Sequence, residues 1–326
     1  MTFFYFFVTA GRMPSKLRHL LSHGPVAMTA SGLFFAAMGA MIKSLGNAIP
    51  LFQITFFRAM VSALLLGLVM WRRGIPLRGE NQGLLVIRSV VGFIAMTLNF
   101  YALARINLGD AAVLNQSSPV FVLLFSWCFL GERFYRSLLG MTALSFLGIV
   151  LILRPSGEVF NLAGLAGIGG ALFAAAAYVS IRRLHRTDSF WTMAFYFMAA
   201  SAILSFPPML AAWKNPDPRQ WALLIGSGLF GTLGQLLMTL AYKNEEASWV
   251  APFSYAGVLF SFVLGIAFFG EHPDLWTLLG AVLTIGGGIA LVVLKNRLRP
   301  PLAPELPVPD GEVLDAVEDR PGASPA

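Results

Sequence analysis

Long apolar runs alternate with short polar stretches along most of this chain. Ten runs come close to the roughly 20 residues that an α-helix needs to cross the hydrocarbon of a bilayer. The pattern predicts an all-α integral membrane protein with ten transmembrane helices, the fifth of them short. The runs are residues 26–45, 50–71, 83–104, 109–130, 138–154, 162–181, 191–212, 220–242, 248–269 and 275–294.

The first five runs repeat in the last five. When the chain is shifted by 139 positions, Leu98–Glu132 falls on Leu237–Glu271 without a gap. Each copy holds an odd number of spans, so the second copy must cross the bilayer in the opposite direction. We therefore expect two inverted five-helix repeats, at residues 26–154 and 162–294. Carriers built in this way bind their substrate at the repeat interface, near the bilayer midplane.

The amino-acid composition indicates that most of this chain is surrounded by lipid. Hydrophobic residues make up 57% of it and charged residues 12%, against about 25% charged in a soluble domain. The connections between the runs are short, which leaves no soluble catalytic domain. The N-terminal segment 1–25 is expected in the cytoplasm. The tail 295–326 is rich in proline and acidic residues, and we expect it to be cytoplasmic and disordered.

Lysine and arginine predict the orientation, because cytoplasmic loops carry the excess of positive charge. With the N-terminus inside, the inner segments hold fifteen basic residues and the outer segments five. This bias predicts a multi-pass protein of the cell (inner) membrane with both termini in the cytoplasm. The net charge of +7 then reflects topology, and nucleic-acid binding is not expected.

Several short motifs, in order and in duplicate, resemble the drug/metabolite transporter superfamily, specifically its EamA-type ten-helix members. The resemblance covers roughly residues 27–294. It rests on these pieces: Phe56-Phe57-Arg58, Asn99-Phe100-Tyr101-Ala102-Leu103, Asp110-Ala111-Ala112, Ser118-Pro119-Val120-Phe121, Leu130-Gly131-Glu132, and in the second copy Leu240-Ala241-Tyr242, Ala251-Pro252 and Phe269-Gly270-Glu271. Their order and duplication carry more weight than any single piece.

The resemblance implies a secondary transporter, usually an exporter, that moves a small metabolite or drug by alternating access. A small polar or anionic substrate and the lipid bilayer are the expected partners, and a homodimer is left open. Uptake is the alternative direction. An integral-membrane enzyme or a scaffold is disfavoured, because the loops are small and the histidines are scattered, which argues against a metal site. No cofactor is expected.

Polar side chains inside a span are costly, so each is a candidate for substrate contact. Arg58 is predicted about 12 Å below the outer end of its helix, Gln116 about 10 Å and Asn99 about 7 Å. With Asn115 they are expected to share a polar pocket in the outer half. A guanidinium at this depth suits a substrate carboxylate or phosphate. The alternative is that Arg58 bonds amides and helix carbonyls to fix the packing.

A second polar group is predicted in the inner half of the membrane. Its members are Tyr196, Gln235, Ser254 and Tyr255, with Tyr178 as a further neighbour. Together with the outer group they would form a polar path across the midplane. The alternative is ordinary hydrogen bonding between helices, which is worth only about 0.6 kcal/mol on average in membranes.

The remaining expectations are structural. Glu132 and Glu271 each follow a glycine at a span end, where a carboxylate caps a helix or pairs with a loop; proton coupling by either is the alternative. Pro119 and Pro252 are expected to remove backbone hydrogen bonds within their spans. Arg88 is expected to extend to the inner lipid headgroups. The glycines shared by spans five and ten fit either internal packing or a dimer face.

Overall fold

The computed structural model describes residues 23–45, 48–103, 114–133, 135–153, 162–270 and 275–298. The first repeat consists of α3 (Gly24–Leu45), α4 (Leu51–Arg72), α5 (Gln82–Leu103), α7 (Ser118–Phe125) with its π-helical extension η2 (Ser126–Leu130), and α8 (Arg136–Leu153). The second consists of α9 (Leu162–Leu184), α10 (Phe190–Ala211), α11 (Pro218–Asn244), α12 (Ala247–Val250) with the 3₁₀ segment η4 (Ala251–Tyr255) and α13 (Ala256–Phe269), and α14 (Leu275–Leu298).

The described helices coincide with the ten apolar runs. Seven described helices are long and apolar enough to cross a bilayer, and three shorter apolar stretches occupy the places of spans four, five and ten. Within the residues that the structure describes there is no strand. The all-α, multi-pass membrane architecture predicted from the sequence is confirmed. Glu271, expected at the end of span nine, and most of the two terminal segments lie outside the described residues.

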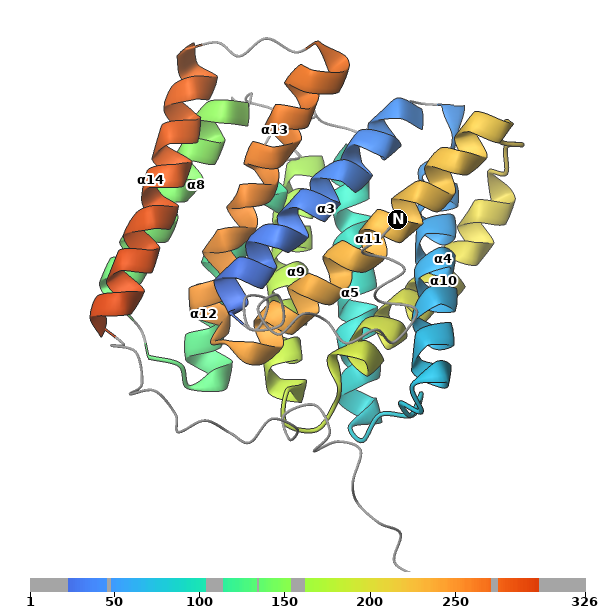
Figure 1. Ribbon diagram of the computed structural model, residues 1–326, viewed down its shortest axis with the longest axis horizontal. Helices are drawn as coiled ribbons and strands as arrows, with labels where there is room; N and C mark the ends of the chain where they lie inside the picture. The colour runs from blue at the N-terminus through green and yellow to red at the C-terminus, as the bar shows by residue number, and fades with distance from the viewer. Residues whose placement is uncertain are drawn as a thin grey trace, which may run out of the picture.

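Helix pairing follows the internal repeat. α3 packs along α11, and the equivalent helices of the other copy, α9 and α5, pack in the same way. The two remaining large contacts, α4 with α10 and α8 with α14, join a helix to its own repeat equivalent. Figure 1 shows α8 and α14 at one side of the bundle, α4 and α10 at the other, and the α3–α11 and α5–α9 pairs between them. These reciprocal pairings are those of an inverted repeat.

The two repeats are tied together at both ends of the bundle. We call the end at which α4 and α9 finish and α8 begins the basic end, because Arg72, Arg183 and Arg136 stand at these helix ends. These helix ends lie at the bottom of Figure 1. There the Asp188 carboxylate accepts backbone N–H groups of Glu80 at 2.9 Å and Asn81 at 3.3 Å, ahead of α5.

At the opposite end the Gln53 side chain plays the equivalent part. It accepts from the Lys214 backbone N–H at 3.1 Å and donates to the Lys214 carbonyl at 2.7 Å, ahead of α11. A carboxylate just ahead of α10 and an amide in the first turn of α4 thus each hold the connection that precedes the third helix of the other repeat.

The two prolines of spans four and nine stand in different settings. Pro119 lies in the first turn of α7, where a backbone N–H has no helical partner, so the expectation of a lost hydrogen bond within the span is wrong for Pro119. Pro252 lies inside the span Ala247–Phe269, where α12 continues into η4 without a break, so it removes a backbone N–H from within the span. Both spans end on a left-handed glycine, Gly131 at φ 67° and Gly270 at φ 65°, as helix C-termini favour.

The α8–α14 pair depends on small residues. A Cβ on Gly148 would lie 2.5 Å from the Gly280 carbonyl oxygen, and Thr284 lies beside it. These glycines therefore serve a contact within one chain. Gly140 and Gly288, the other glycines of the pattern, are less crowded, because a Cβ added to either would have no atom of the described residues within 4 Å.

Candidate functional site

Arg58 lies where α4 meets α3, α10 and α11. It is seven residues into α4, about 10 Å from the end opposite the basic end. Gly231 of α11 lets that helix approach, because a Cβ there would lie 3.2 Å from the Arg58 Nε. The Nε atom is buried and has no hydrogen-bond partner among the described residues. No acidic side chain of the described residues interacts with this guanidinium.

Two hydroxyl groups share the surroundings of Arg58. Thr55 Oγ1 and Ser201 Oγ are also buried without a partner in the described part of the chain, and both residues line the same narrow void as Arg58. The void has a volume of about 10 Å³, which is room for one water molecule. Three polar groups without hydrogen-bond partners surround this void, which makes it a candidate binding site for a polar ligand.

Thr55 and Ser201 were not predicted from the sequence. Thr55 is three residues before Arg58, hence on the same helical face, and this spacing is a signal that was available. Ser201 is on α10, far away in sequence, and only the packing of α10 on α4 brings it there.

Arg88 was interpreted wrongly from the sequence. It lies six residues into α5, about 9 Å from the basic end, but its side chain is 1% exposed. The guanidinium carbon lies 4.2 Å from the centre of the Phe197 ring, and Nε and Nη1 have no hydrogen-bond partner among the described residues. Arg88 points into the bundle because α10 packs against that face of α5, so it does not reach the headgroups.

Asn99 and the residues at the start of span four do not form one pocket with Arg58. Asn99 packs on Gly170 of α9, where a Cβ would lie 2.7 Å from its Oδ1, and this Oδ1 is buried without a partner in the described structure. Asn115 is exposed and Gln116 is partly buried, both just ahead of α7. Neither lines the void around Arg58.

The residues predicted for the inner half are spread over several environments. Gln235 is 2% exposed and donates weakly to Thr239 Oγ1 at 3.3 Å. Tyr255 is buried, and its hydroxyl has no partner among the described residues, whereas Ser254 bonds the Ala251 carbonyl of its own turn at 2.8 Å. Tyr196 packs at the edge of the central apolar cluster.

Tyr178 also packs against the central apolar cluster. It stacks on Tyr242 with ring centres 5.1 Å apart. Its hydroxyl interacts electrostatically with both Arg58 and Arg88, which places it near both cations.

Glu132 connects the two repeats at the basic end. Its carboxylate accepts backbone N–H groups of Ala247 at 2.9 Å and Ser248 at 3.1 Å, and the Ser248 hydroxyl at 2.5 Å. These are the free donors at the start of span nine, which a carboxylate satisfies well. Gly131 makes the contact geometrically feasible, since its left-handed conformation ends η2 just before Glu132.

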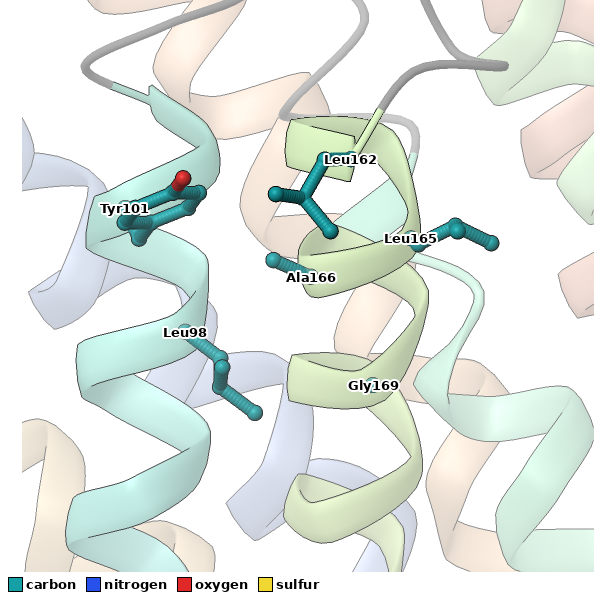
Figure 2. Close-up of a pocket in the computed structure, with 6 residues that line it drawn as sticks. All are labelled: Leu98, Tyr101, Leu162, Leu165, Ala166 and Gly169. Carbon is teal, nitrogen blue, oxygen red and sulfur yellow. The ribbon is translucent and has the colours of Figure 1, made fainter.

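A further hollow is apolar and lies elsewhere. Figure 2 shows Leu98 and Tyr101 of α5 facing Leu162, Ala166 and Gly169 of α9. The hollow measures about 410 Å³, and Leu162 and Leu165 on its rim are exposed. Its lining includes no charged side chain, so it offers nothing to fix a polar substrate. Among the described residues, no cluster of His, Cys, Asp or Glu is suited to a metal ion.

The described part of the chain holds ten helical spans in an inverted repeat, with unpartnered polar groups between the repeats. These features are typical of a membrane transporter. The EamA-like transporter family matches this chain twice, at residues 23–154 and 161–294. The chain belongs to that family.

Three named relatives are transporters. The pseudopaline exporter CntI of Pseudomonas aeruginosa is 35% identical over 279 residues, covering 85% of this chain and 98% of its own. Solute carrier family 35 member G1 of Homo sapiens is 29% identical, covering 81% and 79%. An S-adenosylmethionine uptake transporter of Rickettsia bellii is 28% identical, covering 80% and 90%.

The fold also matches a solved structure. A crystal structure with 19% sequence identity superposes with a TM-score of 0.74 and covers 85% of this chain and 98% of its own. At this identity the match supports the fold alone. The family and the named relatives, which are transporters and not enzymes, give the class of this protein.

Proposed function

We propose that this protein exports a small anionic metabolite from the cytoplasm across the cell membrane. The observation that carries the proposal is the Arg58 guanidinium, which meets two unpartnered hydroxyls in a void between the repeats. This buried cation has no acidic partner in the described structure, so it favours an anionic ligand. The planar guanidinium can bind a carboxylate or a phosphate through two parallel hydrogen bonds. The direction rests on similarity to the pseudopaline exporter, while the uptake carriers among the relatives keep uptake as the second candidate.

The way the repeats are joined supports alternating access. The contacts that bridge the repeats at the two ends include polar pairs: Glu132 with Ser248 and Asp188 with Glu80 at the basic end, and Gln53 with Lys214 at the other. Such hydrogen bonds are exchanged for bonds to water when they open, so each costs only about 1–3 kcal/mol to break. Rocking of one repeat on the other would open each end in turn around Arg58.

The topology within this proposal puts the basic end and both termini in the cytoplasm. The excess of basic residues there supports this orientation. A homodimer stays a prediction.

Arg58 gives the most direct experiment. Purified protein is screened for stabilising metabolites by thermal shift, and each compound found is tested for transport in liposomes. We expect Arg58→Ala to abolish transport, and Arg58→Lys to restore little, because a lysine lacks the bidentate fork. Membrane abundance of both variants should stay within about twofold of wild type, a modest change because single substitutions commonly cost about 1 kcal/mol.

Arg78 supplies the matched control. It is an exposed arginine in the connection between α4 and α5, and Arg78→Ala should leave transport unchanged. If both Arg58 variants instead vanish from the membrane, the guanidinium serves packing and the proposal loses its main support.

A further inference from the structure

Arg88 is a second buried arginine, separate from the void at Arg58. It is among the largest fully buried side chains of the described protein. Its guanidinium lies against the face of Phe197, which attracts the cation but accepts no conventional hydrogen bond. Two of its nitrogen atoms, Nε and Nη1, have no acceptor among the described residues. Donors of this strength, buried without a partner, are costly, which favours an occupant that supplies acceptors.

Arg88 and Arg58 approach the same aromatic side chain. Arg88 lies over the Phe197 ring, and Phe197 also lines the void at Arg58. Tyr178 interacts electrostatically with both cations. Because Arg58 is about 10 Å from one end of the bundle and Arg88 about 9 Å from the other, their backbone positions lie on opposite sides of the midplane, and their side chains approach Phe197 from two helices.

The local packing is adapted to hold Arg88 against the ring. One turn after Arg88 on α5 stands Gly92, where a Cβ would lie 2.8 Å from Phe197 Cε2 and 3.6 Å from Arg88 Nη1. A larger residue at this position would push the ring away. No acidic side chain of the part that the structure describes interacts with Arg88. An apolar side chain of similar length would fill the same space without burying a charge, so packing alone does not explain an arginine here.

We propose that the substrate carries two separate anionic groups and that Arg88 binds the second of them. Arg58 holds one carboxylate or phosphate and Arg88 the other, with Phe197 between the two cations. The inference rests on the proposed transport function and adds the substrate class, a molecule with two separated anions. Selectivity follows, because a ligand with one anion leaves one buried guanidinium without its acceptor.

The test is a binding series on the full chain, purified in detergent. The probes are straight-chain dicarboxylates from succinate to suberate, each compared with the monocarboxylate of equal length. Glycerol 3-phosphate is added because it concentrates its negative charge in one group. Dissociation constants are measured by calorimetry for wild type, Arg88→Met, Arg88→Lys and Arg58→Met.

For wild type we expect one favoured dicarboxylate length, bound about tenfold more tightly than its monocarboxylate, since each charge-assisted pair is worth that much or more. Arg88→Met should remove the preference for two anions and the length optimum. It should change the affinity for the monocarboxylate and for glycerol 3-phosphate less than about twofold, because Arg58 still binds their single anion. Arg88→Lys should keep part of the preference, and Arg58→Met should weaken all probes.

The outcomes separate this inference from the proposed function. A length optimum that survives in Arg88→Met would overturn the role of Arg88, and so would a wild type that binds mono- and dicarboxylates equally. In both cases loss of transport in the Arg58 variants would still uphold the transport proposal. If Arg88→Met lowers the melting temperature but leaves the ratio between the two probe classes intact, Arg88 is a packing residue.

Discussion

Individual small residues decide how closely these helices pack. Gly170 and Gly169 are neighbours on α9, yet their surroundings differ. A Cβ at Gly170 would lie 2.7 Å from Asn99 Oδ1, whereas at Gly169 it would make an ordinary contact at 3.6 Å from Leu98 Cδ1. Overpacking a buried contact usually costs about 1–3 kcal/mol. Substituting alanine at both positions therefore separates two effects: steric crowding, which is present only at Gly170, and the change in helix propensity, which is the same at both.

We expect Gly170→Ala to lower the stability of the purified protein by about 1–3 kcal/mol and to slow transport by displacing Asn99. Gly169→Ala should be neutral or stabilising by about 0.4–1 kcal/mol, because alanine reduces the freedom of the unfolded chain. Melting temperatures in detergent and transport in liposomes test both. Equal effects of the two variants would contradict the crowding argument.

Thr55 tests the polar void in a second way. Its hydroxyl is buried without a partner among the described residues, so Thr55→Val should stabilise the ligand-free protein by about 1 kcal/mol and still reduce transport. The control is Thr142→Val on α8, whose hydroxyl donates to the Leu138 carbonyl at 2.8 Å. That change should cost stability and spare transport. Wild-type transport by Thr55→Val would mean that the void is not part of the substrate path.

At the scale of helices, the ends carry most of the polar chemistry. The Glu132 carboxylate caps the start of span nine, and Asp217 caps α11 through a reciprocal capping box with Gln220. Carboxylates are favoured at helix N-termini because they accept the free backbone N–H groups there. Of these two caps, Glu132 is the one that reaches across from the other repeat. Its hydrogen bonds therefore join elements that alternating access would separate.

We expect Glu132→Gln to keep measurable transport with unchanged pH dependence, because the amide retains one acceptor oxygen for the backbone of span nine. The loss of the second acceptor should cost about 1 kcal/mol, a typical value for an N-cap. Asp217→Asn is the control and should change little, since asparagine caps as well as aspartate. Substrate exchange that no longer responds to a proton gradient in Glu132→Gln would instead assign Glu132 to proton coupling.

The whole molecule has two ends that differ mainly in charge. Arginines and lysines concentrate at the ends of α4, α9 and α11 and at the start of α8, all on one side of the bundle in Figure 1. If this side faces the cytoplasm, a reporter that is active only in the periplasm should give no signal when fused after Arg299. Fusion at Asn215, between α10 and α11, should give a strong signal. The reverse pattern would invert the topology proposed here.

The spans, the inverted repeat and the class of protein were all readable in the amino-acid order. Apolar runs of membrane length are expected to form helices, because lipid offers no hydrogen-bond partners and a helix satisfies its backbone groups internally. The repeat is visible in sequence since both copies carry the same helix-end signals, such as Gly131 and Gly270. Arg58 was also identifiable, because a charge deep within an apolar run is costly wherever its helix packs.

Which polar groups meet depended instead on how the helices pack. Depth along a helix is readable from residue number, but the direction in which a side chain points depends on the helix packed against it. The position of Arg88 in its span predicts a headgroup contact, but α10 covers that side chain with Phe197. Ser201 became a neighbour of Arg58 only through the packing of α10 on α4. Glu132 found its partners across the repeat boundary, in a helix start far away in the chain, because the folded repeats bring those two ends together.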